Sequence, residues 1–301
     1  MKNRFNLQSV LSYPDRGHWG NSKWRGNTTG HIINDLIGHF SARSFVDVCE
    51  GSGTSRDLCN DLGIKYYGFD LHSGHDFTAD YVLKSIDAPA DMVFSHPPYH
   101  NMITYSGNVW GQNHSADTSR CINIDEFLEK SQVMLQNQRE ATREGGIYCS
   151  LIGDHRNRKF GYRSYQADFI QMMPKSELYS VVIKQQNNPS SSWKTYSGNF
   201  IPILHEYLIL WKKSKKCLFQ VSFEVALNAT QFVSKTWRTA IRLAFMRLGK
   251  IASLSNIYLE VERVAGHLIA NNKNWKAKIR QTLQKHYQNV ERGVWGIEQV
   301  A

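Results

Sequence analysis

A short apolar segment that runs directly into two prolines offers the clearest chemistry in this sequence. Met92–Phe94 precedes Ser95 and His96, and Pro97, Pro98 and Tyr99 follow. Because proline has no backbone N–H, the pair must end a strand. The strand then leaves carbonyl groups at the carboxyl edge of its sheet, where α/β proteins bind ligands. Alternatively, the same residues could form only a rigid turn, in which the Tyr99 ring covers the core.

A glycine turn upstream points to a nucleoside ligand. In Asp-Val-Cys-Glu-Gly-Ser-Gly-Thr, Gly51 and Gly53 lie between an expected strand and helix, where backbone N–H groups can approach a ligand. Asp70 ends the next expected strand and could accept hydrogen bonds from ribose hydroxyls. A dinucleotide fingerprint would need a third glycine, but Arg56 stands there. These residues favour a nucleoside cofactor without a pyrophosphate, although a GxG pair is often only a tight turn.

The elements that must hold these residues alternate between strand-like and helix-like segments, which predicts an α/β sheet. Expected strands are 44–49, 65–70, 91–95, 146–153, 177–186 and 205–213, the last two as an antiparallel edge pair. Expected helices are 56–62, 124–143 and 165–173.

A lysine-rich segment, 212–216, predicts a domain boundary. The expected domains are 1–215, which would bind the cofactor and carry out catalysis, and 216–301. Three short helices over 236–249, 254–268 and 274–288, closed by a Gly-Val-Trp strand, predict a small winged-helix-like second domain.

Composition narrows the class of protein. The 301 residues carry a net charge of +10, which favours a polyanionic partner. From Thr236 onward there are eleven Lys or Arg and four Asp or Glu, so the excess is concentrated at one end. No 18-residue apolar stretch or signal-peptide core occurs, so we expect no membrane partner. Five scattered cysteines predict a cytoplasmic protein without a metal site.

Together, these segments resemble the S-adenosylmethionine-dependent amino-methyltransferases. In that family Asp, Asn or Ser precedes Pro-Pro and an aromatic residue, and the cofactor motif is Asp-Pro-Phe-x-Gly-Ser-Gly-Thr. The upstream segment 25–37 is similar to the one that closes over the methionine end of the cofactor. The order of the motifs resembles the γ-type DNA amino-methyltransferases over residues 15–213. The resemblance implies a class I methyltransferase (Rossmann-like) sheet and the cofactor S-adenosyl-L-methionine.

Residue by residue, the resemblance implies two sets of site residues. Cofactor-binding residues would be Arg25, Asn27, Asp47, Glu50, Gly51, Ser52, Gly53, Thr54, Asp70 and Asp76. Catalytic residues would be Ser95, His96, Pro97, Pro98 and Tyr99. Asp76 would contact the adenine ring of the cofactor, or it could equally be a helix N-cap.

His96 departs from the family pattern. Two acceptors that engage both N–H bonds of an exocyclic amino group make its nitrogen a better nucleophile, and the Pro97 carbonyl can be one of them. A neutral imidazole at position 96 can be the other, with Ser95 as a helper, but a protonated imidazole cannot accept. Activity should therefore fall as His96 is protonated. Alternatively, His96 only orders the turn, or the site is catalytically degraded. Tyr99 would stack on a base extruded from the duplex.

The expected DNA contacts come from two loops and the basic tail. They are Tyr105, Trp110, Trp193, Lys194, Lys273, Lys276, Lys278, Arg280 and Lys285. Alternatively, the two loops are ordinary surface loops, and the charged face of the helix contacts only solvent.

The sequence thus predicts a base-flipping methyltransferase acting on double-stranded DNA at adenine N6. Cytosine N4 is the alternative, then RNA or a protein glutamine, then a non-catalytic DNA-binding regulator. No nuclease motif is present, so any restriction endonuclease would be a separately encoded partner.

Overall fold

The structure, a computed structural model, describes residues 7–157, 161–187, 199, 201–215, 237–249, 251–270 and 272–296. The chain divides into two compact units, Met1–Gln220 (unit 1) and Val221–Ala301 (unit 2).

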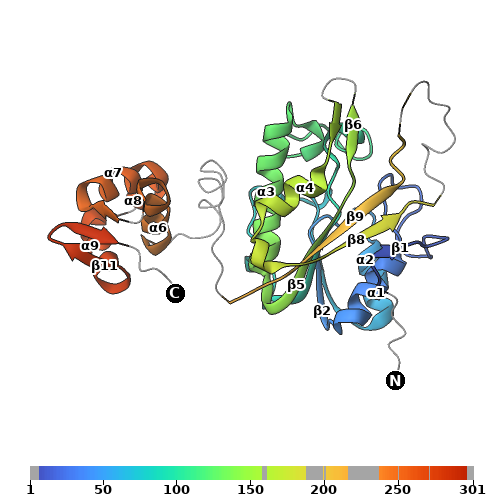
Figure 1. Ribbon diagram of the computed structural model, residues 1–301, viewed down its shortest axis with the longest axis horizontal. Coiled ribbons are helices and arrows are strands. Elements are labelled where there is room, and N and C mark those ends of the chain that lie inside the picture. The colour runs from blue at the N-terminus through green and yellow to red at the C-terminus, as the bar shows by residue number, and fades with distance from the viewer. Residues whose placement is uncertain are drawn as a thin grey trace. The chain divides into compact units, whose positions relative to one another are not determined.

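Unit 1 is built on a seven-stranded sheet with the order β1-β8-β9-β5-β4-β2-β3 (Figure 1). Its strands are β1 (Val10–Leu11), β2 (Ser44–Asp47), β3 (Lys65–Gly68), β4 (Ala90–Ser95), β5 (Thr142–Ile152), β8 (Leu178–Gln185) and β9 (His205–Lys212). β2 runs parallel to β3 and β4, and β4 runs parallel to β5. β9 runs antiparallel to both β5 and β8. A separate hairpin pairs β6 (His155–Asn157) with β7 (Gly161–Arg163).

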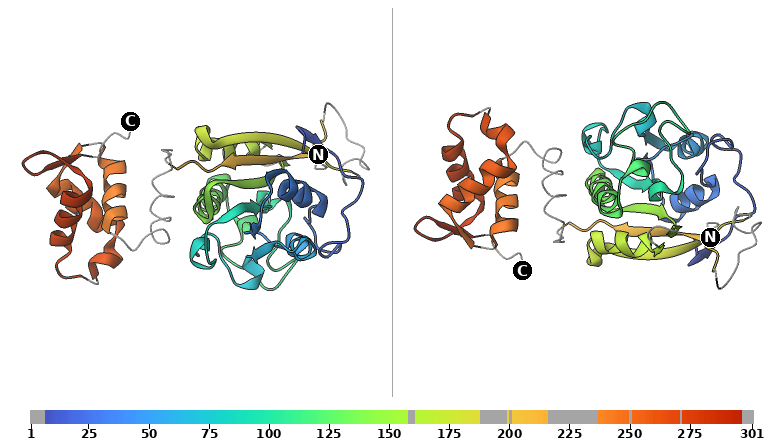
Figure 2. Two further views of the ribbon diagram at one scale, coloured as in Figure 1. Left: turned by 90° about the horizontal axis from the view of Figure 1, so that it is seen from below. Right: turned by 90° about the horizontal axis from the view of Figure 1, so that it is seen from above.

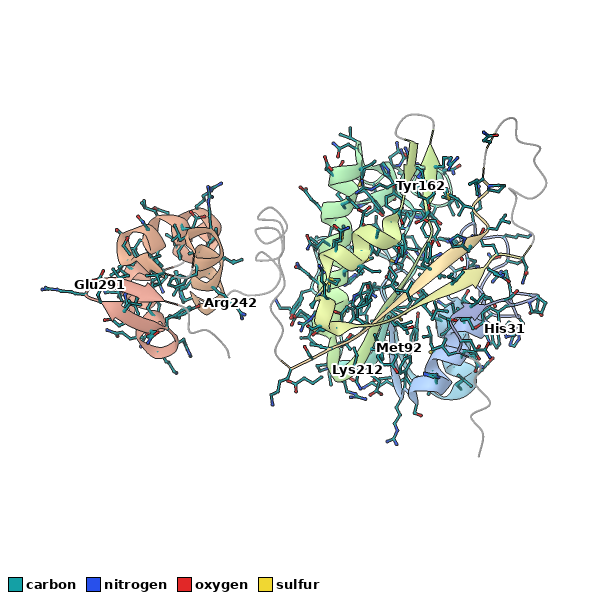
Figure 3. All side chains as sticks on the ribbon, viewed as in Figure 1. His31, Met92, Tyr162, Lys212, Arg242 and Glu291 are labelled. Carbon is teal, nitrogen blue, oxygen red and sulfur yellow. The ribbon has the colours of Figure 1, made fainter. Side chains whose placement is uncertain are left out.

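Alternation along the strands gives this sheet a core on each face. Val46 and Val93 belong to one cluster, while their neighbours Phe45 and Phe94 belong to the other. Helices from different parts of the chain complete each cluster, as Figures 1 and 2 show. Met92, labelled in Figure 3, is fully buried in the second cluster.

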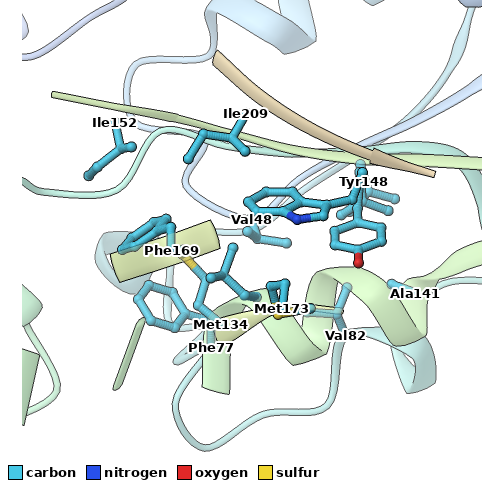
Figure 4. Packing of buried hydrophobic residues seen from close by; sticks show 14 of the residues in the cluster. Val48, Phe77, Val82, Met134, Ala141, Tyr148, Ile152, Phe169, Met173 and Ile209 are labelled. Atoms are coloured by element: carbon cyan, nitrogen blue, oxygen red, sulfur yellow. The ribbon is translucent and has the colours of Figure 1, made fainter. Parts of the chain in front are cut away.

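The helices of unit 1 cover the two faces in pairs. They are α1 (Gly30–Phe40), α2 (Thr54–Leu62), α3 (Ile124–Ala141) and α4 (Tyr165–Met172). Buried residues of α1 and α2 pack on one face. Those of α3 and α4 pack on the other, where Figure 4 shows Met134 of α3 and Phe169 of α4. Side-chain oxygens cap two of these helices: Thr29 accepts from the N–H of His31, and Asn123 accepts from the N–H of Glu126.

The expected class I methyltransferase sheet with an antiparallel strand pair is confirmed. The pair β8–β9 does not form the edge, because β1 adds a parallel strand outside β8. β5 begins four residues earlier than expected, at Thr142, directly after α3. Sequence periodicity missed β1, β6 and β7 because each is only two or three residues long.

Unit 2 contains helices and a small antiparallel sheet. The helices are α6 (Trp237–Leu248), α7 (Leu254–Val264), α8 (Gly266–Ala270) and α9 (Trp275–His286). The strands β10 (Ile251–Ser253), β11 (Gln288–Glu291) and β12 (Val294–Gly296) have the order β10-β12-β11. The helix expected over 254–268 is divided at Ala265, whose N–H still bonds to the Val261 carbonyl. Ile279 and Leu283 of α9 are fully buried in the core of this unit.

Neither a membrane-spanning helix nor a metal site emerges from the described residues. No helix among them is both long and apolar enough to cross a bilayer. The same residues contain no group of three or more His, Cys, Asp or Glu that could hold a metal ion.

A buried carboxylate joins α3, β5 and the end of β9. Glu177 accepts from Arg139 Nη2 at 2.7 Å, from the Tyr148 hydroxyl at 2.7 Å and from the Ser214 N–H at 2.8 Å. Burial alone would raise the pKa of Glu177, but these hydrogen bonds outweigh it and lower the pKa to about 2.

Replacing Glu177 with Gln should lower the free energy of unfolding by about 1.5 to 3 kcal/mol, since the charge-assisted hydrogen bonds from Arg139 to Glu177 are lost while Arg139 keeps its ion pair with Glu140 at 3.2 Å. The depressed pKa adds stability above the unfolded-state value, which is lost as pH falls from about 4.5 towards 2. Urea unfolding across this range should show that pH dependence reduced in Glu177→Gln. The exposed Glu144→Gln is the control. Equal stability of Glu177→Gln and wild type at neutral pH would contradict the prediction.

Candidate active site

The carboxyl ends of β2 and β4 lie side by side, at the point in the sheet where the strand order reverses. From β2 the chain passes outward to β3 and returns to β4 on the other side of β2. Asp47 is paired with Phe94, and the N–H of Val48 bonds to the Phe94 carbonyl at 3.0 Å. Such a switch point opens a crevice where α/β proteins bind ligands. The glycine turn and the Pro-Pro segment therefore begin at the same place.

The glycine turn is held in a shape that requires glycine. Gly51 and Gly53 have φ values of 56° and 86°, in the left-handed region. The N–H of Gly51 donates to Asp70 Oδ2 at 2.8 Å, which ties the turn to the end of β3. Asp70 also accepts from the N–H of His72 through Oδ1. Asp70 thus shapes the turn as well as facing the space beside it.

Asp47 anchors the other side of the turn. Its carboxyl accepts from the Ser55 hydroxyl at 2.6 Å and from the N–H of Cys49 at 2.9 Å. Burial raises its pKa to about 7 against the effect of these bonds. These bonds make Asp47 a structural support for the turn.

The N-terminal segment closes over the turn. Asn27 Oδ1 accepts from the Ser52 hydroxyl at 2.8 Å, and Asn27 Nδ2 donates to the Asn21 carbonyl at 2.6 Å. The nearest heavy atom to a Cβ added at Gly51 would be Trp24 Nε1, at 3.3 Å. This contact places the 21–27 segment directly above the glycine turn.

A first cavity, with about 770 Å³ of empty space and partly open to solvent, lies between these parts. Its walls include Asn27, Gly51, Asp70, Phe77 and His96. They also include Asp47, Glu50, Thr54, Pro98, Tyr105 and Trp110. Acidic side chains occur in these walls, whereas the described residues that line them include no Lys or Arg. This charge disfavours a phosphate ligand and favours a neutral or cationic one.

Side chains of the segment 95–99 point in different directions. Ser95 turns into the interior, where its hydroxyl lies within hydrogen-bond distance of Gln138 Oε1, at 3.1 Å, and of the Ser150 hydroxyl, at 2.9 Å. His96 faces the cavities, and its Nε2 lies 2.7 Å from the Tyr99 hydroxyl. The structure therefore offers no helper role for Ser95.

A second cavity, with about 580 Å³ of empty space, lies against the first. Pro97, Tyr99, Gln186 and Glu206 line it. The residues that line both cavities are Gly26, Asn27, His96 and Tyr105. His96 is therefore at the junction of two compartments, the arrangement that transfer between two bound molecules requires.

Glu206 and Lys184 are functional candidates that sequence reasoning missed. Glu206 is 6% exposed, and its Oε1 accepts from the Tyr99 hydroxyl at 2.7 Å. Its Oε2 accepts from Lys184 Nζ at 2.5 Å. An acidic residue at the start of the apolar strand 205–213 was the available signal.

Several expected site residues lie elsewhere. Asp76 caps Thr78, accepting from both its N–H and its hydroxyl, and is not in the wall of the first cavity. Ser52, Gly53 and the exposed Arg25 support or flank the turn without lining either cavity. Tyr105 and Trp110, expected at DNA, line the first cavity. Trp193 and Lys194 lie outside the described residues.

The expected basic residues of unit 2 are exposed on and just before α9. They are Lys273, Lys276, Lys278, Arg280 and Lys285. The ammonium group of Lys276 lies over the rings of Tyr258 and Trp275, at 5.6 and 5.2 Å from their centroids. Ile279 and Leu283 of the same helix are buried, so the exposed basic side chains surround a buried apolar stripe. Unit 2 thus presents a positively charged helix surface to solvent.

The Tyr99 ring packs directly on the backbone of Gly153. A Cβ added at Gly153 would lie 2.6 Å from Tyr99 Cε2, closer than any stable contact. Gly153→Ala should push the ring out of place and lower the kcat of the expected methyl transfer at least 10-fold. The dissociation constant of S-adenosylmethionine should stay unchanged. Steady-state kinetics and calorimetry would measure both. Gly266→Ala, which adds a methyl group in open space, is the control. An unchanged kcat in Gly153→Ala would show that the rate of this reaction does not depend on the position of the Tyr99 ring.

Comparisons with known proteins give only distant similarities. No family model and no curated protein matches the chain. Similar solved structures include a proposed DNA modification methylase of Thermus thermophilus complexed with S-adenosyl-L-methionine, at 17% identity, covering 57% of this chain and 72% of that one, with a TM-score of 0.31.

Two further similar structures are also described as a methylase or a methyltransferase. An rRNA methylase of Streptococcus thermophilus is 12% identical over 62% of this chain and 96% of its own, with a TM-score of 0.33. An S-adenosylmethionine-dependent methyltransferase of Archaeoglobus fulgidus is 11% identical over 63% and 96%, with a TM-score of 0.36. Such low scores leave the function to be inferred from the strand order and the two joined cavities of this chain.

Proposed function

We propose that this chain is a methyltransferase that transfers a methyl group from S-adenosylmethionine to the N6 amino group of adenine in double-stranded DNA. The observation that carries the proposal is the junction of two cavities at His96 and the Pro-Pro segment, with the glycine turn in one wall of the first.

The first cavity fits the cofactor by its donor set. Asp70 offers carboxylate oxygens for ribose hydroxyls, and Leu71 and Phe77 offer apolar surface for a base. The acidic walls favour the positive charge of a sulfonium group. When bound there, S-adenosylmethionine would supply an electrophilic methyl group. Asn27 and Asp70 would hold it, and the 21–27 segment would exclude water.

The second cavity would hold the acceptor base. Pro97 lines it, and its carbonyl would be one acceptor for the amino N–H groups, with the His96 imidazole as the second. The amino nitrogen would gain the methyl group as the carbon–sulfur bond of the sulfonium breaks, with the electron pair of that bond staying on sulfur, and it would release one proton to solvent. Because proline fixes the backbone, these acceptors need little reorganisation during the reaction.

The direct test supplies labelled S-adenosylmethionine with unmethylated duplex DNA and analyses the digested nucleosides by mass spectrometry. N6-methyladenine supports the proposal. N4-methylcytosine keeps the amino-transfer chemistry and changes the base, and label only in a parallel RNA or protein sample overturns DNA as the acceptor.

Exposed lysines of unit 2 would contact DNA phosphates. Replacing Lys273, Lys276 and Lys285 with Ala should weaken duplex binding and reduce the slope of log K against log salt by about 0.9 for each phosphate that is no longer neutralised. Fluorescence anisotropy across a salt series measures both. The matched control replaces the exposed Lys84, Lys175 and Lys212 of unit 1. Equal slopes in both triple variants would exclude the α9 surface as a phosphate-binding face.

A further inference from the structure

Glu206 is an ionised carboxylate in the wall of the second cavity. Burial would raise its pKa, but the opposing influences, of which the positive charge of Lys184 is the largest, outweigh burial and hold the pKa well below its usual range. Lys184 Nζ, 2.5 Å from Oε2, balances the negative charge. Oε1 of this carboxylate lies 3.8 Å from His96 Nε2, beyond hydrogen-bond distance, and the Tyr99 hydroxyl connects the two groups.

The hydrogen bonds around Tyr99 can be satisfied in one direction only. An ionised carboxylate accepts and never donates, so the single hydroxyl hydrogen of Tyr99 goes to Glu206 Oε1, 2.7 Å away. The Tyr99 oxygen can then only accept from His96 Nε2, also 2.7 Å away. His96 Nε2 must therefore carry a hydrogen. In the neutral ring this leaves Nδ1 as the acceptor.

We propose that Glu206, acting through the Tyr99 hydroxyl, is a positioning residue that fixes His96 in the Nε2–H tautomer and so keeps Nδ1 available to accept from the amino group of the substrate. The assignment of the substrate rests on the proposed function. His96 lines both cavities, and none of the hydrogen bonds among the described residues involves its Nδ1. Glu206 of β9 would thereby position His96, the residue directly before the Pro-Pro pair. The amino-methyltransferases carry Asp, Asn or Ser at this position.

The test measures the tautomer of His96 by long-range ¹H–¹⁵N correlation of ¹⁵N-histidine-labelled protein at about pH 8, where an ordinary imidazole is neutral. His96→Asn identifies the His96 signals. Wild type should show Nε2 protonated and Nδ1 bare. In Glu206→Gln the amide can both donate and accept, so both tautomers should be populated.

A double variant gives the sharper result. Lys184→Met/Glu206→Met replaces the buried ion pair with apolar side chains, a change that such pairs often tolerate. The Tyr99 hydroxyl then has His96 Nε2 as its remaining partner and donates to it. The tautomer should invert to Nδ1–H, and kcat should fall at least 10-fold, while the cofactor KM stays within twofold.

Glu126→Gln is the matched control, because Glu126 pairs with Lys130 at 2.9 Å and lines neither cavity. It should keep the wild-type tautomer and rate. An Nδ1–H tautomer in wild type, an unchanged tautomer in the double variant, or an unchanged kcat despite inversion would overturn the proposal. If wild type methylates no DNA, the proposed function fails, while the NMR result, obtained without substrate, still decides how Glu206 acts on His96.

Discussion

Replacing His96 with alanine should lower kcat for methyl transfer by about 100-fold to 1000-fold, the usual cost of removing one preorganised hydrogen-bond partner from a reacting centre. His96 lies where the two cavities meet, and the first cavity keeps its glycine turn and Asp70 in the variant. The cofactor dissociation constant should therefore change by less than about threefold. Single-turnover rates with saturating cofactor would isolate this effect.

His96→Asn is the matched rescue variant. Its amide oxygen can accept an N–H bond, so it should keep more activity than His96→Ala. His39→Ala, on α1 outside both cavities, controls for the loss of an imidazole. Full activity of His96→Ala would mean that the acceptor comes from another group and that position 96 only shapes the turn.

Replacing Asp70 with alanine should raise the cofactor dissociation constant about 10-fold to 100-fold. Asp70 Oδ2 holds the N–H of Gly51 at 2.8 Å, and its carboxylate lines the first cavity. The variant loses charge-assisted hydrogen bonds, each worth about 1.5 to 3 kcal/mol, and it loosens the glycine turn. Isothermal titration calorimetry with S-adenosylmethionine gives the constant directly.

Asp87→Asn is the control for this measurement, because that exposed carboxylate pairs with Lys65 and lines neither cavity. Its affinity for the cofactor should equal that of wild type. If Asp70→Ala binds the cofactor as tightly as wild type does, the first cavity is not the cofactor site. Asp70 would then be only a support for the turn.

The sequence predicted the sheet and the junction of its motifs because both follow from local signals. Apolar runs marked β2 and β4, and Gly51 and the Pro-Pro pair marked the points where they end. Parallel neighbours must bring these ends to one edge, so local pattern was enough to place the turn beside His96.

The sequence could not reveal that Glu206 and Lys184 lie beside His96 and Tyr99, because both come from strands more than 80 residues away. Glu206 reaches the site because β9 runs antiparallel to β5, which brings the start of β9 to the edge where β5 ends. Lys184 is paired with Glu206 by the register of β8 on β9. The interior position of Ser95 depends on Gln138 and Ser150, which pattern alone does not identify.

The wall shared by the two cavities has a thermodynamic consequence. Gly26, Asn27 and Tyr105 border both spaces, so any shift that one ligand imposes on them alters the fit of the other. Linkage requires this influence to be reciprocal: the factor by which a ligand in the first cavity changes the affinity of the second equals the factor by which a ligand in the second changes the affinity of the first. A wall that tightens only when both spaces are filled would therefore hold each ligand more firmly in the presence of the other, and emptying either space would loosen the hold on both.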